Sequence, residues 1–127
     1  MFNKDEHKLL DESLNAARKA DKCNSKVNED EKIFHVIGNI FIGSEFGAIS
    51  ECVFDTLNIR AVVNITAGSR RVPNIFVSRG VEYINFEIFD HPGASINPVF
   101  RIFEKIDKWV KEGRRILFHC SAGLSRS

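Results

Sequence analysis

The residues of this 127-residue chain that are best suited to chemistry stand together at its carboxyl end. His119 is followed directly by Cys120, and Gly123, Arg126 and Ser127 follow within the next seven positions. A site for a phosphate dianion needs converging hydrogen-bond donors, and attack on phosphorus needs a nucleophile. Cys120 could attack as a thiolate, which a positive environment stabilises. Arg126 could bond two phosphate oxygens at once through its planar fork, which a lysine cannot match.

A short apolar run leads into this motif and could present it. The run at 115–118 predicts a buried strand that ends at His119. A strand that enters a glycine-bearing loop directs successive backbone N–H groups to one point, the geometry that holds a phosphate. We expect Ser127 to donate a hydrogen bond to the thiolate and His119 to brace the loop from behind. The expected phosphate cradle comprises Ser121, Ala122, Gly123, Leu124, Ser125 and Arg126.

This pattern resembles the signature His-Cys-x-x-Gly-x-x-Arg-Ser/Thr of the cysteine-dependent protein phosphatases. The version with Ala-Gly-x-Ser-Arg-Ser is similar to the dual-specificity branch, and the resemblance covers roughly residues 33–127. It implies that Cys120 forms a phosphocysteine intermediate, which water then hydrolyses. It also implies phosphoprotein substrates carrying phosphotyrosine, phosphoserine or phosphothreonine, and a reaction that uses neither metal nor cofactor. The catalytic residues would be Cys120, Asp90, Arg126 and Ser127.

Asp90 is the candidate proton donor, because transfer of phosphate to a thiolate expels a poor leaving group unless an acid protonates it. The family's acid is an aspartate about thirty residues before the cysteine, and Asp90 has that place here. It follows an expected strand at 81–88, on a turn marked by Pro92 and Gly93. Asp90 could instead be only a turn or capping residue, and Glu87 and His91 are local competitors for the acid role.

Other functions stay open. One alternative is a phosphatase for a non-protein phosphate monoester, such as a phosphoinositide, an RNA 5′-phosphate or a glycan phosphate. Lipid-directed relatives often place lysines inside the signature loop, and this loop has none. A second alternative is a phosphate-binding module without turnover.

The chain stops on the last residue of its signature loop, whereas domains of the family continue with further helices. We therefore expect a truncated catalytic domain that lacks the C-terminal helices, with low stability and little or no activity as an isolated chain.

Charge and hydropathy exclude several classes of protein. A formal net charge of +1 gives no electrostatic argument for binding nucleic acid or an anionic membrane. No apolar run approaches the length of a membrane span, and the N-terminus lacks the hydrophobic core of a signal peptide. We expect one globular domain, and the oligomeric state stays open.

The cysteine count argues against metal or disulfide frameworks. Three cysteines are an odd number, and no two of them have a metal-ligand spacing. Cys23 lies in a polar segment and Cys52 within an expected helix. A reducing compartment, the cytoplasm or the nucleus, fits this usage best.

Two regions differ in composition. Residues 1–32 form a polar extension, in which Leu9, Leu10, Leu14 and Ala17 recur at helical spacing and predict a loosely attached helix over about 5–20. A polar linker is expected at 21–32.

From residue 33 to residue 127, the sequence predicts a partial catalytic domain built as an α/β fold. A paired-strand start is expected at 33–42, interrupted at Gly38 and Asn39, then a helix capped by Ser44 and ending near residue 57. Buried strands follow at 60–66 and 81–88, then a helix capped by Asn97 and ended by Gly113. Two apolar faces are predicted: Phe46, Ile49, Val53, Phe54 and Leu57 on the first helix, and Val99, Ile102, Phe103, Ile106, Trp109 and Val110 on the second. Together with the motif strand, these elements predict a central mixed sheet flanked by helices, with the phosphate loop at a strand's carboxyl end.

Overall fold

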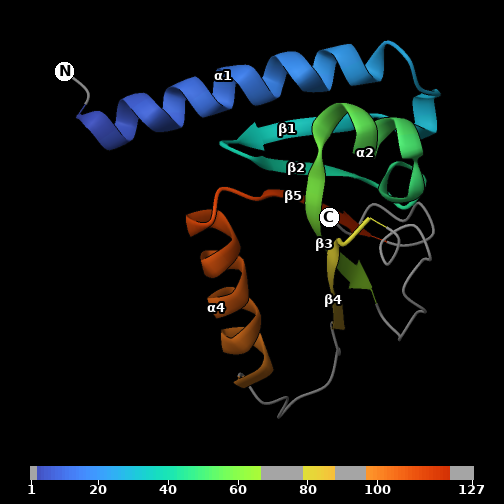
Figure 1. Ribbon diagram of the computed structural model, residues 1–127. Helices are drawn as coiled ribbons and strands as arrows, with labels where there is room; N and C mark the ends of the chain where they lie inside the picture. Colours follow the sequence, from blue (N-terminus) through green and yellow to red (C-terminus); the bar gives the residue numbers. More distant parts are fainter. Residues whose placement is uncertain (1–2, 67–78, 88–96, 121–127) are drawn as a thin grey trace.

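The computed structural model describes residues 3–66, 79–87 and 97–120, and they form a mixed α/β fold around a five-stranded sheet (Figure 1). The strand order is β1-β2-β5-β3-β4. β1 pairs antiparallel with β2, and the remaining pairs are all parallel. The predicted mixed sheet is therefore confirmed. The strands are β1 (Ile33–Ile37), β2 (Ile40–Ser44), β3 (Ile59–Thr66), β4 (Glu82–Glu87) and β5 (Arg115–Cys120).

Helices cover both faces of the sheet. The helices α1 (Lys4–Asn24) and α2 (Glu51–Leu57) share one core cluster with Phe41, Val62 and Leu117. The helix α4 (Asn97–Lys111) packs through Trp109 on a second cluster. That second cluster holds Ala61, Val63 and Ile116, which alternate along their strands with residues of the first cluster. Because side chains alternate between faces along a strand, the two clusters lie on opposite sides of the sheet.

The edge strand β1 is fastened to α1 by side chains that pair with its backbone. Asn24 donates from Nδ2 to the Ile33 carbonyl oxygen at 2.7 Å and accepts from the Ile33 amide at Oδ1 at 2.8 Å. One carboxamide thus occupies both hydrogen-bonding groups of a fully buried residue, as a neighbouring strand would. At the other end of β1, the Gly38 amide donates to Ser13 Oγ at 2.7 Å. α1 therefore lies along β1 (Figure 1).

The apolar face predicted for α1 was wrong. The prediction that this helix is only loosely attached was also wrong. Leu9, Leu10 and Leu14 are exposed, whereas Ala16, Ala20 and Cys23 are the residues buried against the domain. Small side chains let the helix approach the sheet and α2 closely, so the contact surface is formed by residues that contribute little to an apolar periodicity. The helix also extends to Asn24, into the segment that was expected to be a linker.

The segment after β2 also differs from the expectation. The Ser44 hydroxyl accepts from the Phe46 and Gly47 amides and precedes the short helix η2 (Gly47–Ile49). Ser50 is the residue that caps α2, accepting from the Val53 amide at 3.4 Å. Two of the predicted apolar positions, Phe46 and Ile49, are exposed because they precede α2.

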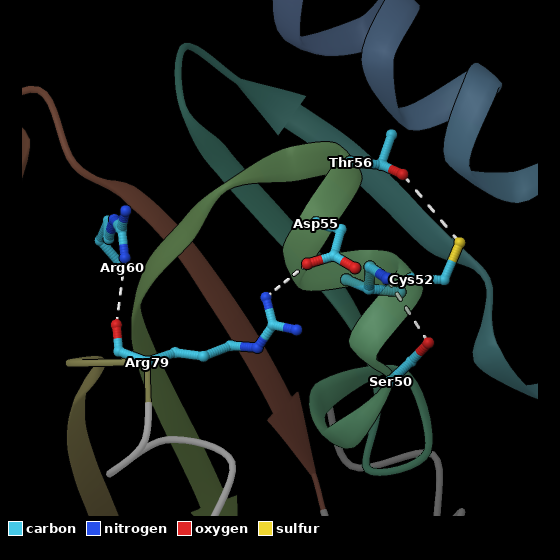
Figure 2. A network of polar contacts seen from close by, with 7 residues as sticks. Ser50, Cys52, Asp55, Thr56, Arg60 and Arg79 are labelled. Atoms are coloured by element: carbon cyan, nitrogen blue, oxygen red, sulfur yellow. Dashed lines mark hydrogen bonds and ion pairs between the residues drawn. The ribbon is translucent and has the colours of Figure 1, made fainter.

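A polar network ties α2 to the segment before β4 (Figure 2). Arg79 Nη1 contacts Asp55 Oδ1 at 2.5 Å, and Arg60 Nη1 donates to the Arg79 carbonyl oxygen at 3.1 Å. The Arg79 guanidinium also lies 6.0 Å from the Phe54 ring centroid. These contacts connect α2, the start of β3 and the start of β4 at the end of the sheet opposite Cys120.

α4 is held by its tryptophan. Trp109 is 1% exposed and donates from Nε1 to Glu82 Oε2 at 3.2 Å. Although desolvation raises the pKa of the Glu82 carboxyl, the hydrogen bonds from Trp109 and Lys105 and the charge of Arg114 hold that pKa below its ordinary value. Gly113, with φ +74°, follows the end of the helix as expected.

Part of the predicted α4 face was wrong, because Phe103 and Val110 are exposed. The side chain of Val99 lies outside the described residues. Within the part of the chain that is described, no helix has both the length and the apolar character needed to cross a membrane.

We predict that Asn24→Ala lowers the free energy of unfolding by about 2 kcal/mol, because the Ile33 amide and carbonyl both lose their partner in a buried place. Urea unfolding followed by circular dichroism measures this change. The matched control is Asn28→Ala, whose exposed side chain donates to Glu31 Oε1 and whose loss is expected to change stability by less than about 0.5 kcal/mol. Equal effects of the two substitutions would contradict the proposed fastening of α1.

Candidate functional site

The carboxyl ends of four parallel strands meet at one edge of the sheet. Cys120, the last residue of β5, stands in register with Ser44 at the end of β2 and with Ile65 near the end of β3. Thr66 and Glu87, the last residues of β3 and β4, are also register partners. In open α/β sheets ligands bind beyond this edge. The sequence predicted the cysteine at a strand's carboxyl end, and the structure adds that this strand lies in the middle of the sheet. Such folds place a site beyond this edge.

The structure describes only part of the predicted site. His119 is described fully and is 6% exposed. Cys120 is described as the final residue of β5, without its side chain. The expected proton donor Asp90 and the expected cradle and hydroxyl, residues 121–127, lie outside the described residues. Their roles stay predictions.

A row of polar side chains crosses the sheet one residue before this edge. Asn64 of β3 is in register with His119 of β5 and with Asn85 of β4. Parallel strands direct register partners to the same face, so these three side chains share the face that α1 and α2 cover. Asn64 and His119 are both buried. The row separates the apolar core from the edge where β5 ends.

Tyr83 anchors this row from within the sheet. Asn64 donates from Nδ2 to the Tyr83 hydroxyl oxygen at 2.9 Å, and Tyr83 packs against the core that α1 and α2 cover. Asn64 Oδ1 is also buried, and among the described residues it accepts no hydrogen bond. A buried acceptor without a partner costs stability, and such groups in native structures tend to have a function.

Sequence reasoning included Asn64 and Tyr83 only as part of the resemblance over residues 33–127, and it missed their contact. The available signal was a polar residue between two apolar neighbours in each of three strands: Asn64, Asn85 and His119. What could not be found from that signal is the register that brings the three together.

On β2, the position in register with this row of polar side chains is occupied by a glycine. Gly43 is the register partner of His119, and a Cβ atom added there would stand 2.6 Å from Ile33 Cδ1. That distance is shorter than a carbon–carbon contact allows. Ile33 therefore fills the space beside the row, and β2 can approach β1 and β5 only with glycine at this place.

The end of β2 is fixed at the same edge by a turn. The Ser44 hydroxyl accepts from the Phe46 amide at 3.2 Å and from the Gly47 amide at 3.3 Å. It donates in turn to the Asp30 carbonyl oxygen in the short helix η1 (Glu29–Glu31). The neighbour of Cys120 in the sheet is thus held by three hydrogen bonds. Within the described part of the chain, no group of three His, Cys, Asp or Glu side chains is arranged to hold a metal ion.

Comparison with known proteins identifies the family. A model of the catalytic domain of dual specificity phosphatases matches residues 40–127. Tyrosine-protein phosphatase vhp-1 of Caenorhabditis elegans is 27% identical over 90 residues, which are 70% of this chain and 13% of vhp-1. Human dual specificity protein phosphatase 1 is 27% identical over 106 residues, which are 83% of this chain and 28% of that protein. The chain spans less than a third of the length of these two relatives.

Solved structures show the same fold. A mouse protein assigned as a dual specificity phosphatase, crystallised with zinc tungstate, aligns with a TM-score of 0.56 at 21% identity, over 80% of this chain and 60% of that one. The human tyrosine phosphatase-like serine/threonine/tyrosine-interacting protein aligns with a TM-score of 0.52 at 23% identity, over 74% of this chain and 65% of that one. At such identities the likeness supports the fold alone.

We predict that Asn64→Leu leaves the free energy of unfolding within about 1 kcal/mol of the parent protein. The lost hydrogen bond to Tyr83 costs about 1 kcal/mol, and removing a buried oxygen without a partner returns a similar amount. Urea unfolding measures the change. Tyr83→Phe is the comparison, since it leaves the Asn64 amide nitrogen unsatisfied as well and is expected to cost about 1–3 kcal/mol. A loss above about 3 kcal/mol in Asn64→Leu would mean that its oxygen has a partner in the folded protein.

Proposed function

This chain belongs to the dual specificity phosphatase catalytic-domain family, and we propose that it hydrolyses phosphate monoesters on proteins through a phosphocysteine at Cys120. The observation that carries the proposal is the place of Cys120 at the carboxyl end of the central strand β5, between β2 and β3. A nucleophile there faces the region beyond the sheet edge where ligands of α/β folds bind. The proposal rests on the match of the family model through residue 127 as well.

The first chemical step transfers the phosphoryl group to sulfur. The Cys120 thiolate attacks phosphorus, the sulfur–phosphorus bond forms, and the bond from phosphorus to the leaving oxygen breaks. Asp90 gives its proton to that oxygen, so that an alcohol or phenol leaves. The backbone amides of 121–126 and the fork of Arg126 hold the non-bridging oxygens. Ser127 donates a hydrogen bond to the sulfur, and water then hydrolyses the phosphocysteine.

The position of Asp90 in the chain supports its role. β4 is parallel to β3 and ends at Glu87, at the same edge of the sheet as Cys120. Asp90 comes three residues later, in the connection from β4 to α4. The acid and the nucleophile thus leave the same edge of the sheet on two strands that are separated only by β3.

His119 and the polar side chains in register with it support the signature loop from the side of the core. His119 directly precedes Cys120 and is buried beside Asn64 and Gly43. A rigid strand end limits the positions that the nucleophile can take, and precise placement of reacting groups contributes strongly to rate.

We propose phosphotyrosine, phosphoserine and phosphothreonine in proteins as substrates, and a reducing compartment, the cytoplasm or the nucleus, as the place of action. The substrate proposal rests on the family, whose model is that of a dual specificity catalytic domain. The compartment follows from the mechanism, because the attacking thiolate must stay reduced. The alternative of a module without turnover is not favoured by a match to a catalytic domain.

We predict that Cys120→Ser abolishes hydrolysis of an aryl phosphate, because serine lacks a thiolate at neutral pH. The assay contains EDTA, so that contaminating metal phosphatases contribute nothing. Cys52→Ser is the matched control and is expected to retain activity, because this cysteine belongs to α2 and not to the signature loop. Hydrolysis that persists in Cys120→Ser would reject the proposed function. A parent protein that is folded and inactive would instead favour the phosphate-binding module without turnover.

We predict that Asp90→Asn lowers kcat for an aryl phosphate at acidic to neutral pH by about 10²–10⁴, the effect of losing a general acid. The loss should be smaller for a leaving group of low pKa, because such a group departs without a proton. Glu87→Gln tests the competing carboxylate and is expected to leave kcat within a factor of about three. If Glu87→Gln gives the large loss and Asp90→Asn does not, the acid is Glu87.

A further inference from the structure

A polar cavity lies at the end of the sheet opposite Cys120, between the end of α2 and the start of β3. Its volume is about 230 Å³. Two guanidinium groups, one carboxamide and one carboxylate form the polar part of its wall. The residues that line the cavity are Phe54, Asp55, Asn58, Ile59, Arg60 and Arg79. Two positive charges thus lie beside one negative charge around a single hollow.

Both arginines are held in place without using most of their hydrogen-bond donors. Arg79 Nη1 contacts Asp55 Oδ1 at 2.5 Å, and the same guanidinium lies 6.0 Å from the Phe54 ring centroid. Arg60 Nη1 donates to the Arg79 carbonyl oxygen at 3.1 Å, and Figure 2 shows the two residues joined in this way. A guanidinium has five N–H donors. Within the described ranges, neither arginine makes a hydrogen bond through Nε or Nη2.

α2 brings two features that oppose an anion at this place. The carboxyl end of a helix is negative, and Asp55 adds a carboxylate. The helix end is already compensated, however, because Arg115 Nη1 donates to the Leu57 carbonyl oxygen at 2.7 Å. The Asn58 amide donates to the Phe54 carbonyl oxygen at 2.9 Å. With Arg115 included, three guanidiniums lie around the end of α2 against the one carboxylate of Asp55, so positive charge is in excess.

We propose that this cavity binds a phosphate group, at a site separate from the signature loop. The Nε and Nη2 donors of an arginine form a planar fork that fits two phosphate oxygens, and Arg60 and Arg79 each have this fork available. Asn58 supplies a carboxamide from a left-handed backbone with φ 53°, and its exposed side chain has no hydrogen-bond partner within the described residues.

The strand β3 separates this cavity from the proposed catalytic cysteine. Arg60 stands near the start of β3, and Ile65, near its end, is the register partner of Cys120. At about 3.3 Å per residue, the five steps from 60 to 65 span roughly 17 Å. A phosphate group in the cavity therefore touches none of the reacting atoms, and its binding does not depend on the proposed function.

Two sources can supply a phosphate group, a phosphorylated side chain of a protein and free inorganic phosphate. The full chain carrying Cys120→Ser is titrated with each at constant ionic strength, and a phosphoserine peptide represents the first source. Two-dimensional ¹⁵N–¹H NMR follows the Asn58 carboxamide, the Arg60 Nε–H and the Gly80 amide. We expect saturable shifts of these signals. Saturation by the peptide alone assigns the site to side chains, and saturation by both includes the free ion.

Substitutions separate this site from phosphate bound elsewhere. Arg60→Gln is expected to weaken binding at these signals about tenfold or more, because it removes a charged donor. Arg60→Lys keeps the charge but lacks the fork, so it is expected to recover only part of the affinity. Arg18→Gln is the matched control, because Arg18 is exposed on α1 and not part of the cavity, and it leaves the affinity unchanged.

The same spectra contain the results that would overturn the proposal. Shifts confined to His119 and the signature loop, with Asn58, Arg60 and Gly80 unmoved by either compound, would mean that phosphate binds only at the proposed catalytic site. Shifts at the cavity that do not saturate, or that are equal in Arg60→Gln and Arg18→Gln, would mean that the cavity has no defined site. An unphosphorylated serine peptide that shifts the signals as strongly would show that the phosphate group is not recognised.

Discussion

β5 forms parallel hydrogen-bonded pairs with two strands at once, β2 on one side and β3 on the other, and the other features of the site depend on this double pairing. The register places Cys120 beside Ser44 and Ile65, at the edge where β4 also ends. It places His119 one residue earlier, between Asn64 and Gly43. A slip of one residue would move His119 to the other face of the sheet and bring an apolar side chain into the polar row. The pairing therefore sets both where the nucleophile stands and what lies beneath it.

The strands could be predicted well from the sequence because their apolar runs are bounded by clear turn residues. The hairpin at Gly38 and Asn39 and the end of α4 at Gly113 are examples, since glycine there adopts positive φ. The strand order could not be predicted, because the composition of β5 does not indicate that this strand lies between β2 and β3. For the same reason the motif around Cys120 was recognised whereas the contact of Asn64 with Tyr83 was not. A motif is local in sequence, and a polar row across strands is not.

Helix faces were predicted less well, and α1 shows why. An apolar periodicity assumes that the largest apolar side chains mark the buried face. In α1 the leucines are exposed, and alanines and a cysteine face the core, since the helix packs closely and is held in addition by polar bonds to β1. Burial in this part of the fold follows from close approach and not from side-chain size. In α4, by contrast, Trp109 is both the largest apolar residue and the buried anchor.

The place of β5 also has a consequence for how this chain folds as it is made. β1 and β2 can pair early, and so can β3 and β4, but in the sheet these two pairs are joined only through β5, the last of the five strands in the sequence. β2, which begins at residue 40, therefore cannot pair with β5 until residues near position 116 have been synthesised. At a synthesis rate of roughly 5–20 residues per second, translation from residue 66 to residue 120 takes on the order of 3–10 s. During that interval β2 and β3 each present an unpaired edge, which is the kind of surface that chaperones cover and that other nascent chains can pair with. The same insertion that centres the nucleophile thus delays completion of the sheet until β5 has been synthesised.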